Sequence, residues 1–237
     1  MKMAVGEMIL RSVVSTIFLV IAAGLLGCGS GSQERDLRTN LRVINGFAEL
    51  EAVDVLIDGR RAFPGMAYLE STGYFNIESG PREIQALAPQ TLTTLAESRS
   101  SLSDNQDQTF LVFGTRTNPR GVLLLDDTEP SPRGTVSFRA IRTAQAIPSA
   151  DLYILGADQS VEENSQTISS VPLGGNSRYL RGLPGEYTIW LTESNKKEVV
   201  AVARKVSFKD RSVYTLLIAD APGGGEPVSV IQLIDND

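Results

Sequence analysis

The chain contains an internal repeat, and this feature restricts its fold more strongly than any other. Residues 41–59 align without a gap with residues 138–156, at a constant offset along the 237-residue sequence. Two such copies, each of about a hundred residues, predict two domains of ordinary size. The further matches are residues 74–84 with 179–189, 122–127 with 231–236, Arg42 with Arg139, Ile44 with Ile141, Asp54 with Asp151, Gly59 with Gly156, Gly80 with Gly185 and Ile84 with Ile189.

Each copy is a series of short strand-like segments separated by turns. Residues 52–58 alternate apolar and polar side chains, residues 186–191 are β-branched and aromatic, and residues 199–208 alternate over much of their length. These are the patterns of β-strands, and no segment after Cys28 sustains the apolar spacing of an amphipathic helix. We therefore expect an all-β protein of two tandem Ig-like antiparallel β-sandwiches, with about seven strands in each.

The domain boundaries follow from the repeat. The first sandwich is predicted at residues 41–128 and the second at residues 135–237, because the prolines and glycine of residues 127–134 break any strand pairing. The Ser/Thr-rich segment 90–108 is compatible with a strand, a long hairpin or a loop. We favour a strand, since its leucines at 92, 95 and 102 need burial.

The first 27 residues are predicted to be a lipoprotein signal peptide. Fifteen uncharged residues, Ser12 to Leu26, follow a cationic start; they are short for a membrane span and typical of a secretory signal core. The run ends at Leu25-Leu26-Gly27-Cys28, which resembles the lipobox of bacterial lipoproteins. The resemblance implies lipidation of Cys28. The alternative is a signal-anchor helix with a buried free cysteine.

Residues 28–40 are predicted to be the lipidated cysteine and a flexible tether, because the segment is small, polar and charged. The expected membrane partner is reached through this lipid. Gly29 follows the cysteine where an Asp would favour inner-membrane retention, so the lipoprotein resemblance implies the outer membrane of a bacterial envelope.

Composition removes several classes of function. The chain has no histidine and one cysteine, so no His general base, no His-bearing metal site, no zinc knuckle and no intrachain disulfide is available. A net charge of −6 argues against a nucleic-acid partner. We expect no enzyme activity, no catalytic residues, no metal site and no cofactor.

Several side chains are candidate binding or metal sites. Asp54 and Asp151 are either ligand contacts or, as we favour, solvent-facing residues or acceptors of hydrogen bonds from a nearby turn. The carboxylates of Asp126, Asp127, Asp235 and Asp237 resemble a calcium site only in being clustered, and we expect them to be solvated. Trp190, near Tyr187, is expected to pack in a core rather than stack on a ligand. The remaining candidates are Tyr68, Tyr74 and Tyr179, as a surface patch, and Lys196 and Lys197, as an exposed turn.

With both copies in view, the chain resembles the bacterial family known as domain of unknown function 4397. The likeness lies in LRVIN at 41–45, AVDVLIDG at 52–59, GYFNI at 73–77, SGP at 79–81 and VLLLDD at 122–127. The second copy keeps ADLYI at 150–154 and LPGEYTI at 183–189. The resemblance implies an exported Ig-like β-sandwich, often in tandem and anchored to the envelope, with no established catalytic residues.

These inferences predict a lipid-anchored, non-catalytic structural or interaction module with an envelope protein or a glycan as partner. The alternative is a carbohydrate- or small-ligand-binding lipoprotein with its site at the junction of the two domains, where pockets are favoured.

Overall fold

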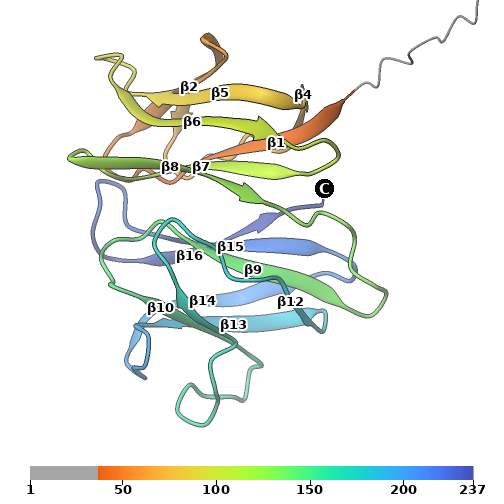
Figure 1. Cartoon of the computed structure of the whole chain (residues 1–237). Coiled ribbons are helices and arrows are strands. Elements are labelled where there is room, and N and C mark those ends of the chain that lie inside the picture. The colour runs from red at the N-terminus through yellow and green to blue at the C-terminus, as the bar shows by residue number, and fades with distance from the viewer. Residues whose placement is uncertain (1–36, 237) are drawn as a thin grey trace, which may run out of the picture. The chain divides into compact units, whose positions relative to one another are not determined.

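The structure is a computed structural model that describes residues 37–236, and these residues form sixteen strands and no helix (Figure 1). The predicted all-β fold is confirmed. The strands are β1 Arg38–Asn45, β2 Ala52–Ile57, β3 Arg60–Ala67, β4 Phe75–Glu78, β5 Gly80–Leu87, β6 Thr94–Leu102, β7 Gln108–Thr115, β8 Asn118–Leu125, β9 Val136–Arg142, β10 Ala150–Leu155, β11 Ile168–Val171, β12 Leu180–Gly182, β13 Gly185–Thr192, β14 Val199–Phe208, β15 Val213–Ala219 and β16 Ser229–Ile234.

The strands build two β-sandwiches of eight strands each. The first pairs the sheet β3-β2-β5-β6 with the sheet β4-β1-β7-β8. The second pairs β11-β10-β13-β14 with β12-β9-β15-β16, in the same order of equivalent strands. Each has its own apolar core, centred on residues such as Val55 and Phe110 in the first and Leu152 and Leu216 in the second. The duplicated sequence thus folds into a duplicated sandwich.

Each sandwich contains one parallel strand pair, which makes two of the four sheets mixed rather than purely antiparallel. β1 pairs in parallel with β7, and β9 pairs in parallel with β15. The chain crosses to the other sheet of the sandwich between the two strands of each pair, so the later strand returns beside the first in the same direction. Strand patterns in a sequence do not reveal such long-range pairing.

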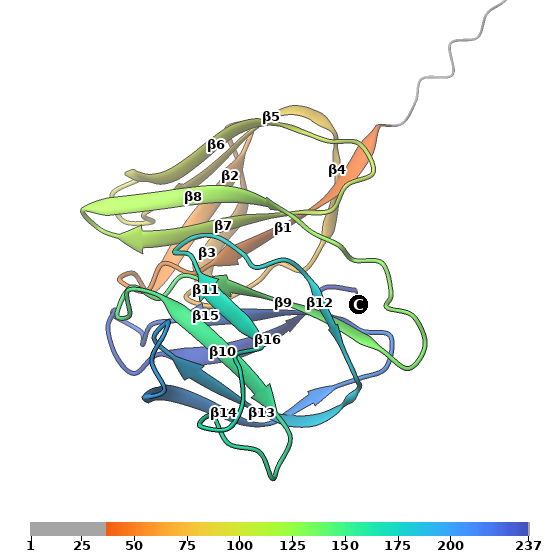
Figure 2. The ribbon, with the colours of Figure 1, turned by 60° about the horizontal axis from the view of Figure 1, so that its bottom comes forward.

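The two sandwiches pack against each other through the sheets that contain β1 and β9 (Figures 1 and 2). A separate apolar cluster joins Ile44, Leu111 and Phe113 of the first sandwich to Ile141 and Leu217 of the second. The residues from Leu37 onward form one compact unit, which contains all strand partners and all four apolar clusters. This unit therefore has what it needs to fold on its own.

One end of the unit, which we call the linker end, gathers the start of β1 and the linker between the sandwiches. Ser79 N–H donates to Leu37 O at 2.8 Å, and Asp126 N–H donates to Asp107 O at 2.9 Å. In the second sandwich, Ser131 N–H donates to Arg211 O at 3.0 Å. The linker end comprises residues 37–38, 78–80, 103–107, 126–135, 182–185, 209–212 and 235–236; the β5–β6 and β13–β14 turns lie at the opposite, far end.

Segment 90–108 contains β6, so the favoured strand is confirmed. Leu95 and Leu102 are buried, but Leu92 is 68% exposed because it lies in the turn before the strand. The predicted signal peptide, Cys28 and most of the tether lie outside the described residues. Within the described part of the chain, no helix long and apolar enough to cross a membrane is found.

Candidate functional site: a buried ion network between the sandwiches

Two arginines lie at equivalent positions of the two facing sheets. Alternation along β1 directs Leu41 and Val43 into the core of the first sandwich, so Arg42 points toward the second. The same alternation on β9 directs Arg139 toward the first sandwich. The side chains of both arginines are at most 1% exposed, so each needs a compensating charge.

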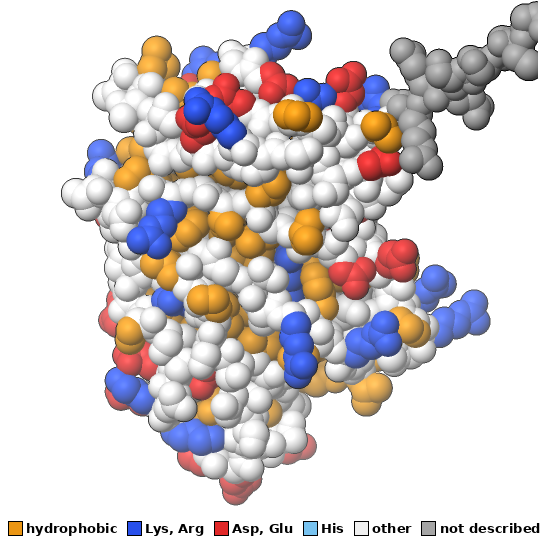
Figure 3. Space-filling model, in the orientation of Figure 1, with side chains coloured by type: hydrophobic (Ala, Val, Ile, Leu, Met, Phe, Trp, Pro, Cys, Tyr) orange, Lys and Arg blue, Asp and Glu red, His pale blue; other side chains and the backbone are white. Residues whose placement is uncertain are grey.

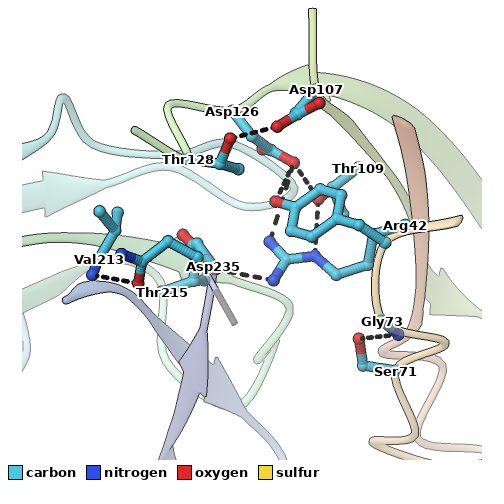
Figure 4. A network of polar contacts seen from close by, with 12 residues as sticks. Arg42, Ser71, Gly73, Asp107, Thr109, Asp126, Thr128, Val213, Thr215 and Asp235 are labelled. Atoms are coloured by element: carbon cyan, nitrogen blue, oxygen red, sulfur yellow. Dashed lines mark hydrogen bonds and ion pairs between the residues drawn. The ribbon is translucent and has the colours of Figure 1, made fainter. Parts of the chain in front are cut away.

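Arg42 finds its carboxylate in the other sandwich. Its Nη1 donates to Asp235 Oδ1 at 2.7 Å, although the two residues are 193 positions apart in the chain (Figure 4). Its Nε donates to Thr109 Oγ1 on the neighbouring strand β7 at 3.0 Å. Its Nη2 has no hydrogen-bond partner among residues 37–236 but lies 3.9 Å from Asp126 Oδ2. The Arg42 guanidinium therefore interacts with the carboxylates of both Asp235 and Asp126.

Arg139 makes the equivalent contacts in the opposite direction, from the second sandwich to the first. Its Nη2 donates to Asp126 Oδ1 of the first sandwich, and its Nε donates to Thr215 Oγ1 on the neighbouring strand β15 at 3.0 Å. Its Nη1 donates to Leu125 O at 2.9 Å. Each sandwich thus supplies an arginine to the other's aspartate. Such reciprocal contacts are the mark of a two-fold, isologous interface between two similar bodies.

Two tyrosines complete the network. Tyr74 OH donates to Asp126 Oδ2 at 2.6 Å, and Tyr179 OH donates to Asp235 Oδ2 at 2.9 Å. The rings cover the arginines, with Arg42 Cζ 4.6 Å from the Tyr74 ring centroid and Arg139 Cζ 4.8 Å from that of Tyr179. The threonines add further donors, since Thr109 Oγ1 donates to Asp126 at 2.5 Å and Thr215 Oγ1 donates to Asp235 at 2.7 Å.

Burial and the neighbouring charges alter the titration of the network. Burial raises the pKa of Tyr74 and of Tyr179 far above the ordinary value, and the Asp126 and Asp235 carboxylates raise both further. Burial alone would lower the pKa of Arg42, but Asp235, Tyr74 and Asp126 outweigh it and raise that pKa. Both tyrosines therefore remain protonated donors near neutral pH.

The rest of the junction is filled by side chains at close approach. A Cβ on Gly46 would lie 2.6 Å from Thr143 Cγ2, and one on Gly174 would lie 1.9 Å from the Phe113 ring. Tyr68 OH donates across the junction to Asp220 O at 2.8 Å. With the apolar cluster and the ion network at its centre, the junction offers no support for the alternative of a ligand site there. The sandwiches are docked rather than merely linked.

Comparison with known proteins addresses the family. Residues 39–153 match the family model described as "Domain of unknown function (DUF4397)". This segment is therefore similar to the DUF4397 family. It begins in β1, spans the first sandwich and ends in β10 of the second, so the sequence-based resemblance is confirmed over these residues. The DUF4397 segment includes both arginines and Asp126 of the network, while Asp235 lies beyond it. No curated protein sequence matches the chain significantly.

Solved structures similar to this chain are distant. One is a family 26 carbohydrate-binding module of Eubacterium rectale Amy13K in complex with maltoheptaose, at 12% identity and a TM-score of 0.28, over 83% of this chain and 97% of that one. Another is a streptococcal virulence factor described by its alpha-glucan binding, at 13% identity and a TM-score of 0.25, over 81% and 96%. A third is a candidate cell adhesion protein of Bacteroides uniformis, at 12% identity and a TM-score of 0.26, over 85% and 99%.

The expectation that the strand-end carboxylates are solvated is wrong for two of them. Asp126 follows β8 and Asp235 follows β16, and the side chains of both are completely buried. Guanidinium groups occupy the space where a cation would lie. Among residues 37–236, no three His, Cys, Asp or Glu side chains converge as a metal-binding group. Asp127 is exposed, as expected of a strand-end acid, whereas Asp237 lies outside the described residues.

Asp54 and Asp151 are both buried, so the interpretation of solvent exposure is wrong; the other favoured interpretation, acceptance of hydrogen bonds from a nearby turn, holds for Asp151 but not for Asp54, whose donors lie in strand β3. Asp54 accepts from Gly65 N–H at 2.8 Å and pairs with Arg61. Asp151 accepts from the backbone N–H groups of Ser170 and Asn195. Both aspartates are at most 2% exposed, so Asp54 holds strand β3 and Asp151 holds β11 and the β13–β14 turn, and neither faces solvent.

The aromatic predictions had mixed outcomes. The tyrosines do not form a surface patch: Tyr74 and Tyr179 belong to the network, and Tyr68 lies in the junction. Trp190 packs with Tyr153 in a small cluster on the outer face of β13, since its neighbours Ile189 and Leu191 point into the core. Trp190 therefore does pack against a buried apolar cluster, as expected, but this cluster lies outside the central core of the sandwich. Lys196 and Lys197 do lie in an exposed turn.

The network itself was not recognised in the sequence, although its signal was visible there. Arg42 and Arg139 are matched arginines inside apolar strands, and Tyr74 and Tyr179 are matched tyrosines. An arginine that stands at the same position of an otherwise apolar strand in both copies indicates that its surroundings are alike in the two copies. Thr109 and Thr215 lie in segments that the alignment of the two copies did not include, and gave no signal of their own.

Proposed function

We propose that this protein is a lipid-anchored, non-catalytic interaction module of the bacterial envelope, whose two sandwiches act as one rigid body. The observation that carries the proposal is the reciprocal ion network. It holds the two copies face to face, because the buried arginine of each copy pairs with the buried aspartate of the other. A module of this kind presents its loops and outer sheets to an envelope protein or a glycan at a fixed geometry.

The chemistry of the network supports a structural role for these residues. A general acid or base must reach a substrate and exchange a proton near the working pH. Here each aspartate is held by a guanidinium and by two hydroxyl donors, and the tyrosine pKa values are displaced upward, away from neutrality. Charges that satisfy each other inside a junction bind the two bodies together, and the residues of this network are not free to act on a substrate.

The anchor rests on the sequence at Cys28. Thioether and amide-linked acyl chains each add about 0.8 kcal/mol per buried methylene, and two or more chains hold a protein stably on a membrane. An anchored module also meets its partners at a raised local concentration. The outer membrane is the proposed location, on the basis of Gly29.

A labelling experiment in cells tests the proposal. Cells that express the full chain or Cys28→Ala are grown with radioactive palmitate, and membranes are separated by density. We expect label only in the wild-type protein and only in the outer-membrane fraction. When the same cells are treated with a chemical cross-linker, we expect an envelope component to be attached to the wild-type protein. Equal label in both proteins would refute the anchor, and the absence of any cross-linked envelope component would refute the interaction role.

A further inference from the structure

The linker end of the second sandwich carries basic side chains that have no acidic partner. Each is exposed, and none makes an ion pair within the described part of the chain. Elsewhere among residues 37–236, Arg82, Arg99 and Lys196 pair with nearby carboxylates, whereas the exposed Arg116 and Arg120 of the first sandwich also make no ion pair. We call the unpaired group at the linker end the basic patch; it consists of Arg133, Arg181, Lys209 and Arg211.

The four residues are neighbours although they come from three segments. Arg211 N–H donates to Thr135 O at 2.8 Å, which places the β14–β15 turn against the loop that carries Arg133. Arg181 on β12 pairs with Ser137 on β9, directly after the same loop. Asp210 lies within this group, and its carboxylate accepts a hydrogen bond from Gly134 N–H at 2.7 Å; the exposed Asp127 and Glu129 lie in the linker at the same end. Figure 3 shows several Lys and Arg side chains at the right of the lower half of the view, over this end of the second sandwich, with Asp and Glu side chains beside them.

An apolar side chain projects beside these charges. Leu183, in the β12–β13 turn, is 69% exposed, the highest value among the large apolar residues of the described chain. Leu37, at the same end of the unit, is 45% exposed. An exposed leucine next to unpaired cations is a combination by which a protein surface meets a lipid interface: the cations attract anionic headgroups, and the leucine enters the apolar boundary.

The chain before the described unit arrives at this end. Leu37 precedes β1, and its carbonyl is bound by Ser79 in the β4–β5 turn. A fully extended chain from Cys28 to Leu37 spans at most about 30 Å, and a flexible one of that length averages about 16 Å. The far end lies an eight-residue strand away, roughly 27 Å farther. The linker end is therefore the end that a lipid on Cys28 would hold at the membrane.

We propose that the basic patch, together with Leu183, docks on anionic phospholipid headgroups and orients the module with its far end directed away from the bilayer. The inference rests on the proposed anchor for its biological setting. Charge complementarity argues for this occupant, because a chain with a net charge of −6 keeps four unpaired cations together at the one end that the chain's own start reaches.

Chemical tethering tests docking independently of natural lipidation. A fragment from Cys28 to Asp237 contains the complete folding unit and the only cysteine of the chain. Its thiol is coupled to maleimide phospholipid in vesicles of either phosphatidylcholine alone or phosphatidylcholine with phosphatidylglycerol. Amide hydrogen exchange is then measured loop by loop.

On anionic vesicles we expect exchange in residues 131–135, 182–185 and 209–212 to slow by roughly three-fold or more, and this protection to disappear at high salt. Exchange in the far-end turns, residues 88–93 and 193–198, serves as the internal control and should be the same on both vesicles. The test variant Arg181→Gln/Lys209→Gln/Arg211→Gln should lose the protection. The matched variant Arg116→Gln/Arg120→Gln/Lys196→Gln removes three charges from the first sandwich and the far end and should keep it.

Equal exchange on the two kinds of vesicle, protection of the far-end turns instead, or equal protection in the two variants would overturn the docking proposal. None of these results depends on whether the cell attaches a lipid to Cys28. A failed palmitate labelling with successful docking would instead refute only the anchor.

Discussion

Arg42 and Arg139 illustrate at the scale of the residue why a charge can be buried in a β-sheet. Removing a guanidinium from water costs several kcal/mol, and only a well-placed carboxylate with further hydrogen bonds offsets that cost. Here an aspartate, a threonine and a tyrosine ring surround each arginine. A buried ion pair of this kind adds little net stability over an apolar pair, but it penalises every arrangement in which the partners are separated.

The tyrosines of the network make stability depend on pH at the alkaline side. Their pKa values are raised in the folded state, so below the ordinary value of about 10 both states are protonated and the full stability is present. Above about pH 10 the unfolded chain ionises while the folded one resists, and stability falls. We expect the urea midpoint to drop between pH 9 and 11, and Tyr74→Phe/Tyr179→Phe to be less stable at pH 8 but to lose less over that interval. An equal drop in both proteins would contradict this assignment.

At the scale of the element, the two facing sheets can approach because selected positions carry no side chain. Gly174 has a φ of +69°, and the ring of Phe113 occupies the space where a Cβ would stand. Phe113 belongs to β7 of the first sandwich and Gly174 to the segment after β11 of the second. The fit of these two elements therefore depends on a single absent carbon atom.

Gly174→Ala should destabilise the protein by about 2–4 kcal/mol, because it adds both a steric overlap and a left-handed backbone strain. Gly134→Ala is the matched control. It has a φ of +77° but no atom within 4 Å of the added Cβ, so only the strain remains and about 1 kcal/mol is expected. Urea denaturation followed by circular dichroism measures both. Similar losses for the two variants would show that the contact with Phe113 is unimportant.

At the scale of the whole molecule, the reciprocal network couples the two copies. Asp235 follows the last strand, yet it neutralises an arginine on the first. Damage at the end of the second sandwich should therefore be felt in the first. The isologous contacts resemble those of a two-fold homodimer whose two subunits have been joined in one chain.

A double-mutant cycle measures this coupling. Arg42→Ala and Asp235→Ala should each cost about 3–5 kcal/mol, since each leaves a buried charge without its partner. The double variant should cost less than their sum by more than about 1 kcal/mol. Arg82→Ala, which removes an ion pair to Glu78, whose side chain is 71% exposed, is the control and should cost no more than about 1 kcal/mol. Additive losses would mean that the two sandwiches are energetically independent.

The sequence by itself determined the duplication, the all-β character and most strand positions, because local alternation and turn residues are properties of neighbouring positions. Residues 94–102 form a strand as favoured, and Asp151 accepts a hydrogen bond from a turn, at Asn195. Tertiary structure alone decided the parallel pairing of β1 with β7, the docking of the two sandwiches and the ion pairs between them. These pairs join Arg42 to Asp235 and Arg139 to Asp126. Those features depend on which faces meet in space, and a contact between residues 193 positions apart leaves no local pattern in the chain.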